Sequence, residues 1–330
     1  MRGAQGSSLS LSAAVPMKHP NPAVLVTYHP EYQAFNPVLV ERTLAKATEL
    51  NVGYLRTDVR WCCFMPDGVR VDPDALTWYR SFLGRAQEYG FRNLVVLSTP
   101  PGSVMRGPVS ARMEAWLKFV ENVVAELGQY CGFYQFMNEP NSPVYSFFPR
   151  SEAPRAVEAG AALIKARYPA ADVAINICMD VWGWRGYLTG LLMESGSAVA
   201  VVGLDHYPGT WTIGRQNRWR DVYHIAECIK SAMPGSVWFK RRLAVMETGF
   251  ATNTWLRGEE RQAQYFADLA NVVTSLRQAY GMEPMIGIYE LCDSDSCAFL
   301  DPEAHFGLLT SDLKAKRAFS TVQNLIASLM

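Results

Sequence analysis

Apolar residues along this chain are grouped into eight short runs, separated by longer segments of mixed character. The runs are rich in β-branched side chains and show almost no alternation with polar residues. That pattern is typical of strands in a parallel sheet, which are buried on both faces. The predicted strands are Ala23–Tyr28, Val52–Val59, Asn93–Ser98, Gly132–Met137, Asp172–Cys178, Val199–Leu204, Leu243–Met246 and Met285–Tyr289.

The segments between these runs carry the period of amphipathic helices. From Arg257 to Tyr280, apolar side chains recur at every third or fourth position, and Gly281 is a typical helix stop. The segment from Met113 to Leu127 has the same period, and Ser110 is its predicted N-cap. Another helix is predicted to open at Asp72, which is followed by Pro.

Strands that alternate with helices favour an α/β fold, and eight such units predict a single (β/α)8 TIM barrel. We expect the barrel to occupy residues 21–330, and residues 1–20, which are rich in Ser, Gly and Ala, to form a disordered leader. An open, doubly wound sheet is the alternative. It would normally carry a glycine-rich phosphate loop after the first strand, and Tyr28-His29-Pro30-Glu31 is not such a loop.

Composition and charge exclude several classes of partner. The 31 Lys and Arg residues balance the 31 Asp and Glu residues, so no excess of positive charge suggests binding to nucleic acid or to an anionic membrane. No apolar run approaches the ~20 residues of a membrane span. The first 20 residues lack the apolar core of a secretory signal, which predicts a cytoplasmic protein, although a secreted protein without its signal would look the same.

The seven cysteines do not form a metal-binding pattern. Cys62 and Cys63 are adjacent, which is poor spacing for metal ligands. Cys292 and Cys297 are close enough in sequence to pair, and the sequence leaves that disulfide open. Three cysteines lie in apolar contexts and are predicted to be small core residues: Cys131, Cys178 and Cys228.

In a barrel of this kind the carboxyl ends of all strands open on one face, where active sites lie. The residues at these ends form a polar and aromatic set. Its candidate site members are Arg56, Asp58, Asn138, Glu139, His206, Tyr207, Glu247, Tyr289 and Glu290.

Two of these strand ends carry a glutamate. In Phe-Met-Asn-Glu-Pro-Asn, residues 136–141, the proline after Glu139 donates no ladder hydrogen bond, so the polar pair is expected at the end of the strand. Glu247 ends the run Leu243–Met246 in the same way. Two carboxyl groups on one face are what glycosidic-bond cleavage needs: one donates a proton to the leaving oxygen, and the other attacks or stabilises the anomeric carbon.

This ordered set of strand-end motifs resembles the clan A retaining glycoside hydrolases, the barrel superfamily that includes families 5 and 39. The resemblance covers nearly the whole chain. It implies that Glu139, which follows Asn138, is the acid/base and that Glu247 is the nucleophile. It also implies that Asn138 contacts the 2-hydroxyl of the sugar.

The resemblance assigns supporting roles to neighbouring strand ends. His206 and Tyr207 match a His and a Tyr that orient the two carboxylates, and Arg56 matches an Arg that holds the nucleophile ionised. One position departs from the pattern. Many members carry a Trp at the end of the eighth strand as the floor of the sugar subsite, and here Tyr289-Glu290 stands there, which puts the floor and the sugar class in doubt.

Several tryptophans lie in loops that are predicted on the same face, and flat aromatic rings cover the apolar face of a sugar well. This loop set comprises Trp61, Trp182, Trp184, Trp211 and Trp255, of which Trp182 and Trp211 are candidate substrate contacts, whereas Trp78, Trp116 and Trp238 are predicted in the core. No cluster of His and carboxylate residues with metal-ligand spacing accompanies His206, so we predict neither a metal nor a cofactor.

The sequence therefore predicts a β-glycoside hydrolase that acts on an oligosaccharide or glycoside with retention of configuration, through a covalent glycosyl-enzyme intermediate. A transglycosylase would use the same residues with a sugar acceptor in place of water. A catalytically silent barrel that binds a carbohydrate is an alternative from another class. A barrel aldolase would need a strand-end Lys for a Schiff base, and no predicted strand ends in Lys.

Overall fold

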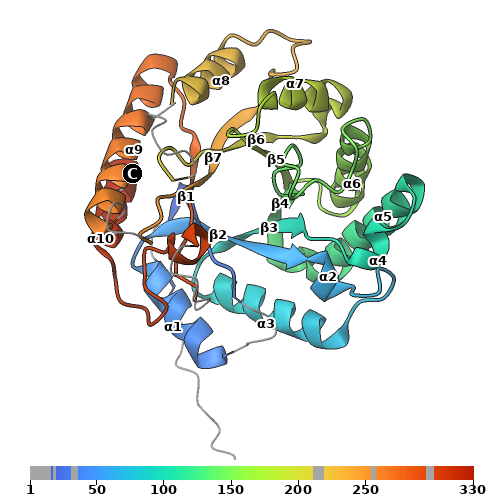
Figure 1. The fold of residues 1–330 in the computed structure, drawn as a ribbon, viewed down its shortest axis with the longest axis horizontal. Coiled ribbons are helices and arrows are strands. Elements are labelled where there is room, and N and C mark those ends of the chain that lie inside the picture. The colour runs from blue at the N-terminus through green and yellow to red at the C-terminus, as the bar shows by residue number, and fades with distance from the viewer. Residues whose placement is uncertain (1–15, 18–19, 31–35, 211–218, 254–257, 295–300) are drawn as a thin grey trace, which may run out of the picture.

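The computed structural model describes residues 16–17, 20–30, 36–210, 219–253, 258–294 and 301–330. They form a closed parallel barrel in which the strands follow one another in chain order and β8 pairs with β1 (Figure 1). The strands are β1 (Asn21–Thr27), β2 (Val52–Arg60), β3 (Arg92–Ser98), β4 (Cys131–Phe136), β5 (Asp172–Cys178), β6 (Val201–Asp205), β7 (Arg242–Thr248) and β8 (Met285–Ile288). The predicted (β/α)8 barrel and its eight strands are confirmed. Most of the expected leader lies outside the described residues.

The helices lie around the outside of the barrel (Figure 1). Among those that the structure describes, none is long and apolar enough to cross a membrane. The helices are α1 (Pro37–Thr48), α2 (Trp61–Phe64), α3 (Pro73–Glu88), α4 (Gly102–Met105), α5 (Val109–Leu127), α6 (Ala153–Arg167), α7 (Trp184–Glu194), α8 (Arg220–Lys230), α9 (Glu259–Tyr280) and α10 (Arg317–Ser328).

Of the three helix ends predicted from local sequence signals, two are confirmed and one is wrong. The side chain of Asp72 caps α3 by accepting hydrogen bonds from two backbone N–H groups of its first turn, as predicted. Gly281 ends α9 in the left-handed conformation that glycine adopts at little cost. The predicted N-cap Ser110 is wrong, because α5 begins one residue earlier, at Val109, directly after Pro108. Pro108 is the N-cap in an extended conformation, and a proline is tolerated at a helix start because it has no N–H to leave unpaired.

Side chains inside the barrel follow the two-residue alternation of the strands. A small apolar cluster fills the centre of the barrel and is separate from the larger core between strands and helices. It contains Tyr54 of β2, Ala174 of β5 and Val201 of β6, among others. Positions two or four residues further along these strands face the same way. Arg56 and Asp58, Asn176, and Asp205 are thereby directed to the interior at the carboxyl ends.

β7 departs from this alternation just before Glu247. Ala244 and Met246 belong to the central cluster, yet Glu247 also faces inward. The pairing between β6 and β7 shifts register at this point, so that Asp205 lies opposite Glu247. One extra residue in β7 is a β-bulge, a device that redirects a side chain. The bulge therefore brings the carboxyl group of Glu247 to the interior of the barrel mouth.

Two tryptophans that were predicted in loops on the strand-end face are core residues instead. Trp61 is fully buried because it opens α2, and its ring stacks on that of Phe119 with centroids 5.1 Å apart. Trp184 is buried in the first turn of α7. Trp116 is fully buried and Trp78 nearly so, as predicted, and Trp238 packs partly buried against the same core. Trp211 and Trp255 lie outside the described residues.

The six cysteines within the described residues carry free thiols. Cys131 is buried, as predicted, and Cys228 is half-buried. The possible partner of Cys292, Cys297, lies outside the described part of the chain. The suggested disulfide between these two residues therefore stays a prediction.

Replacing Trp116 with Ala should destabilise the protein strongly. The indole is fully buried between α5 and α6, and its Nε1 donates a hydrogen bond of 3.1 Å to the carbonyl of Ala156. Loss of a buried Trp side chain costs about 3–5 kcal/mol of the free energy of unfolding. Trp182→Ala is the matched control, because that side chain is 98% exposed and its loss should change stability by less than about 0.5 kcal/mol. Denaturant unfolding measures both, and equal effects would contradict the packing described here.

Candidate active site

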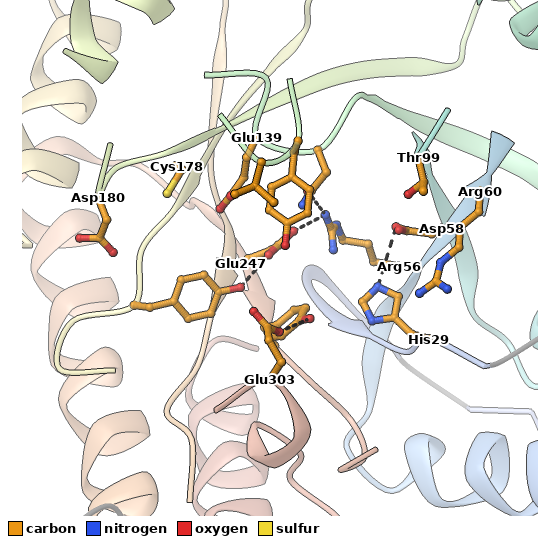
Figure 2. Close-up of a pocket in the computed structure, with 15 residues that line it drawn as sticks. His29, Arg56, Asp58, Arg60, Thr99, Glu139, Cys178, Asp180, Glu247 and Glu303 are labelled. Carbon is orange, nitrogen blue, oxygen red and sulfur yellow. Dashed lines mark hydrogen bonds and ion pairs between the residues drawn. The ribbon is translucent and has the colours of Figure 1, made fainter. Parts of the chain in front are cut away.

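A cavity of about 520 Å³ opens at the carboxyl ends of the strands (Figure 2). A second hollow of about 370 Å³ adjoins it between the loops after β3 and β4. Polar groups from most strands line the first cavity, as expected for the active face of such a barrel. Seven of the predicted site residues lie there: Arg56, Asp58, Asn138, Glu139, Tyr207, Glu247 and Tyr289.

The two glutamates meet in this cavity. A carboxyl oxygen of Glu139, one of Glu247 and one of Asp205 all lie within 4.8 Å of one another. All three residues are at most 8% exposed. Carboxyl groups at this distance interact strongly when they are shielded from water, because a negative charge on one disfavours ionisation of the others.

Both oxygens of Glu247 are held by neighbouring side chains. Arg56 Nη2 forms an ion pair with Oε1, and the hydroxyl of Tyr207 donates a hydrogen bond of 2.6 Å to Oε2. Arg56 is itself fully buried, and its Nε donates to Gln135 Oε1 at 3.0 Å. These contacts fix the orientation of the Glu247 carboxyl group.

Asn138 and Asn176 connect the ends of β4 and β5. Asn176 Nδ2 donates to Asn138 Oδ1 at 2.8 Å, and Asn176 Oδ1 accepts from the backbone N–H of Glu139 at 3.0 Å. Asn138 Oδ1 also accepts from Arg56 at 3.2 Å. With its carbonyl oxygen occupied in this way, Asn138 has its amide N–H groups available for a ligand in the cavity.

The backbone turns sharply around Asn138. Met137 has a φ of 59° and Glu139 a φ of 43°, which places both in the left-handed region. Non-glycine residues enter that region at a cost of roughly 1–2 kcal/mol each, and such costs are concentrated at functional sites. The turn ends the alternation of β4 and brings Asn138 and Glu139 together at the rim of the barrel.

Glu139 differs from Glu247 in its surroundings. Burial, together with the negative charge of Glu247, raises the pKa of Glu139 to about 8. No cation pairs with Glu139 in the described part of the structure. The pair therefore has the division that an acid and a nucleophile need: burial keeps Glu139 neutral near pH 7, whereas Glu247 is held by the guanidinium of Arg56.

A second polar cluster lies on the other side of Arg56, where Figure 2 shows His29, Asp58 and Arg60 together. His29 Nδ1 lies 3.2 Å from Glu290 Oε2, and His29 Nε2 lies 3.8 Å from Asp58 Oδ1. Burial opposes the charged form, but these two carboxylates raise the pKa of His29 to about 10. His29 is therefore a cation at neutral pH, and Asp58 accepts a further hydrogen bond of 3.0 Å from Ser98.

Aromatic rings form one wall of the cavity. Tyr289 contacts Tyr207 and Phe306, with ring centroids 5.8 Å and 5.3 Å away. The hydroxyl of Tyr289 donates to Glu303 at 3.1 Å. Tyr289 thus occupies the position at the end of β8 where the resemblance would place a tryptophan.

The structure does not bring every predicted residue to the cavity. The ring of His206 packs edge-on against Trp219, with centroids 4.8 Å apart, and does not line the cavity. Asp205, one residue earlier, faces the two glutamates instead. Glu290 lies behind His29, and Trp182 is exposed away from the cavity lining. Trp211 lies outside the described residues.

Several residues of the site were not among the candidates. His29 and Asp205 could have been found, because they follow Leu25 and Val201 of the central cluster by two-residue steps along their strands. Cys178, predicted as core, lines the cavity for the same reason, four positions after Ala174 of β5. Tyr145 comes from the loop after β4 and Glu303 from a short 3₁₀ helix (Pro302–His305), where no sequence period marks them.

The three carboxyl groups of Glu139, Asp205 and Glu247 also have the spacing of a possible cation site. The surroundings of these three groups favour protonated carboxyl groups over metal ligands. Glu247 already pairs with Arg56, and burial raises the pKa of both Glu139 and Asp205, which favours their neutral forms. A metal would instead require deprotonated ligands.

Known structures share this fold. GH5_18 from Streptomyces cattleya, in complex with GlcNAc, matches with a TM-score of 0.69 and 17% identity over 94% of this chain and 81% of that one. A family 1 β-glucosidase from Thermotoga maritima matches at 0.68 with 12% identity over 88% and 86% of the two chains. A family 39 glycoside hydrolase from Bacteroides cellulosilyticus matches at 0.65 with 17% identity, over 95% of this chain and 65% of that one.

No family model matches the sequence, and no curated protein matches it. The similarity to solved structures therefore concerns the fold. In architecture, the chain is structurally similar to clan A glycoside hydrolases, with the same eight-stranded parallel barrel.

Proposed function

We propose that the protein is a retaining β-glycoside hydrolase in which Glu139 is the acid/base and Glu247 is the nucleophile. One observation carries the proposal: carboxyl oxygens of the two residues lie within 4.8 Å in a cavity at the barrel mouth. Retaining glycosidases keep their two carboxyl groups about 5–5.5 Å apart, whereas inverting enzymes need roughly 6.5–9.5 Å to admit a water molecule. The short gap supports double displacement.

In the first step Glu247 attacks the anomeric carbon while Glu139 gives its proton to the leaving glycosidic oxygen. Arg56 and Tyr207 hold the oxygens of Glu247, so the nucleophile is oriented before the substrate arrives. Asn138 is placed to donate its amide N–H to a sugar hydroxyl. The product of this step is a glycosyl ester on Glu247 and a carboxylate on Glu139.

In the second step Glu139 takes a proton from water, which attacks the same carbon and releases Glu247. A sugar acceptor in place of water would make the protein a transglycosylase with the same residues. The remaining wall of the cavity, where sugar hydroxyls need hydrogen-bond partners, is lined by Tyr289, Asp58 and His29. Glu290 supports His29 from outside the lining.

A screen of aryl β-glycosides and short oligosaccharides tests the proposal. Turnover of at least one β-glycoside by the wild-type protein, and its loss in a Glu247 variant, is the expected result. A protein that binds sugars with measurable affinity and turns over none of the aryl β-glycosides would be a silent carbohydrate-binding barrel, which is the alternative function.

The pH dependence of kcat/KM follows from the environment of Glu139. This residue must be protonated to act as the acid, and its proton is lost as pH rises through its pKa of about 8. We therefore expect kcat/KM to stay high below about pH 8 and to fall above it. Initial rates from pH 5 to pH 10 on one substrate measure this limb. A fall centred near 4.5, the ordinary value of a glutamate, would contradict the burial described for Glu139.

A further inference from the structure

Asp205 is a third carboxyl group in the cavity cluster, and the two-step reaction gives it no role. We propose that Asp205 is a positioning residue that keeps its proton throughout the reaction and donates a hydrogen bond from Oδ1 to the carboxyl group of Glu139. The inference rests on the proposed function for its kinetic consequences. Its structural part concerns only where one proton resides.

Asp205 is placed for this role by its strand. It is the last residue of β6, is fully buried, and lies opposite Glu247 of β7. One of its oxygens is within 4.8 Å of carboxyl oxygens of both Glu139 and Glu247. A buried carboxyl group this close to two others is repelled, when it ionises, by whichever of them carries a negative charge.

The two oxygens of Asp205 have different surroundings. The amide Nδ2 of Asn176 donates to Oδ2, so Oδ2 acts as an acceptor, as a carbonyl oxygen does. Oδ1 is buried and makes no hydrogen bond to any described residue. An ionised carboxylate would leave charge on an unpaired buried oxygen, which is costly, whereas a hydroxyl at Oδ1 needs only an acceptor.

Glu139 is the acceptor that the geometry offers. Both oxygens of Glu247 are already occupied, by Arg56 and by the hydroxyl of Tyr207. Glu139 has its backbone N–H fixed by Asn176, the same residue that holds Asp205. Asn176 therefore fixes the backbone of Glu139 and Oδ2 of Asp205, which leaves Oδ1 as the oxygen of Asp205 that is available to Glu139.

The charged and titratable groups around Asp205 come from five strands. Arg56 of β2 favours its ionised form, and so does the hydrogen bond from Asn176 of β5. Burial and the negative charge of Glu247, joined by that of Glu139 once it is ionised, raise the pKa of Asp205 well above the ordinary value of an aspartate. Tyr207 and Cys178 are neutral at pH 7, because burial raises the pKa of each. The balance agrees with a protonated Asp205.

The hydrogen bond would matter most when charge develops on Glu139. As the proton of Glu139 passes to the glycosidic oxygen, the electrons of the broken C–O bond stay on that oxygen, and Glu139 becomes a carboxylate. Asp205 retains its own proton. A hydrogen bond to an ionised acceptor is roughly twice as strong as one to a neutral acceptor, so Asp205 stabilises the product form of the acid and lowers its pKa.

Two variants separate this role from a merely structural one. Asp205→Asn keeps an oxygen for Asn176 and places an N–H donor toward Glu139. We therefore expect kcat/KM within about threefold of the wild type, and the fall of kcat/KM at high pH (the basic limb of the pH profile) at nearly the same pH. Asp205→Leu fills a similar volume without a donor. It should lower kcat/KM by about tenfold and move the basic limb upward by about one pH unit, since Glu139 then loses its donor.

Three results would overturn the proposal. If Asp205 were ionised, Asp205→Asn would remove a negative charge beside Glu139, and the basic limb would fall by more than one pH unit. A loss of more than tenfold in Asp205→Asn, or equal behaviour of Asn and Leu, would also exclude the donor role. If Asp205→Leu does not fold, the Asn variant alone decides through its pH profile.

Infrared difference spectroscopy tests the proton without relying on turnover. At pH 7 the wild-type spectrum minus that of Asp205→Asn should contain the carbonyl stretch of a protonated carboxyl group. A carboxylate band in its place would overturn the proposal even in an active enzyme. If no glycoside is turned over, the proposed function fails while the infrared result still stands on its own.

Discussion

Replacing Glu247 with Gln is expected to reduce turnover of β-glycosides by about 10³-fold or more, because a nucleophile that is lost leaves only the residual effects of binding and electrostatics. Gln has the same shape and still offers an oxygen to Arg56. That choice matters because Arg56 is 1% exposed and pairs directly with Glu247. An Ala variant would leave the buried guanidinium of Arg56 without its partner and cost about 3–5 kcal/mol of the free energy of unfolding. A loss of activity could then reflect unfolding and not the missing nucleophile.

The measurement is kcat on an aryl β-glycoside, with thermal unfolding of the same sample. Glu121→Gln is the matched control, since that side chain is exposed on α5 and, among the described residues, pairs with Lys118 alone at the surface. We expect the control to keep full activity. A Glu247→Gln protein that retained more than a tenth of wild-type turnover would remove Glu247 from the mechanism.

Replacing Glu139 with Ala should affect substrates according to their leaving groups. General acid catalysis contributes about 10²–10⁴-fold, and a leaving group that is already acidic needs little of it. We therefore expect kcat/KM to fall by that factor for alkyl glycosides or disaccharides and by less than about tenfold for activated aryl glycosides. kcat/KM covers only the steps up to and including departure of the leaving group. Slow hydrolysis of the intermediate therefore does not mask the difference between the two substrates.

The comparison needs one variant and two substrates that carry the same sugar. Asn141→Ala is a useful second variant, because Asn141 lies in the same loop and its side chain bonds to the backbone of Cys178. It should change kcat/KM equally for both substrates. An equal loss on both substrates in Glu139→Ala would show that Glu139 is not the acid.

The barrel could be predicted from the sequence because its strands are buried on both faces and its helices are amphipathic. Runs such as Asp172–Cys178 need no tertiary information to be read as strands, and the structure reproduces that one without change. The signal is local hydrophobicity summed over several residues. A single residue that sets a boundary carries less information, as the helix start at Val109 in place of a Ser110 cap illustrates.

Reading the carboxyl ends of the predicted strands found seven of the residues that line the cavity, but it did not say which of two neighbours faces inward. Alternation from Val201 directs Asp205 and Tyr207 to the interior and His206 to Trp219 outside. That distinction was within reach of the sequence. The inward position of Glu247 could not be predicted from the sequence, because it depends on a register shift between β6 and β7 that no local pattern indicates.

Tryptophans were the least predictable part of the site. Trp61 follows a strand end, as a substrate contact would, yet it begins a short helix that turns its ring onto Phe119. Whether a strand-end aromatic residue faces the cavity or the helices depends on the first turn of the loop. Loop residues such as Tyr145 reach the cavity by the path of the chain, which the sequence pattern does not determine.

The configuration of the first-formed product tests the central claim most directly. Proton NMR of the anomeric signal, recorded within the first minutes of hydrolysis of a β-glycoside, distinguishes the product before it mutarotates. A carboxyl gap within 4.8 Å predicts double displacement, so the β-anomer should appear first and the α-anomer only later. If the α-anomer appears first, Glu247 is not a nucleophile and the proposed mechanism is wrong, even if both glutamates prove essential.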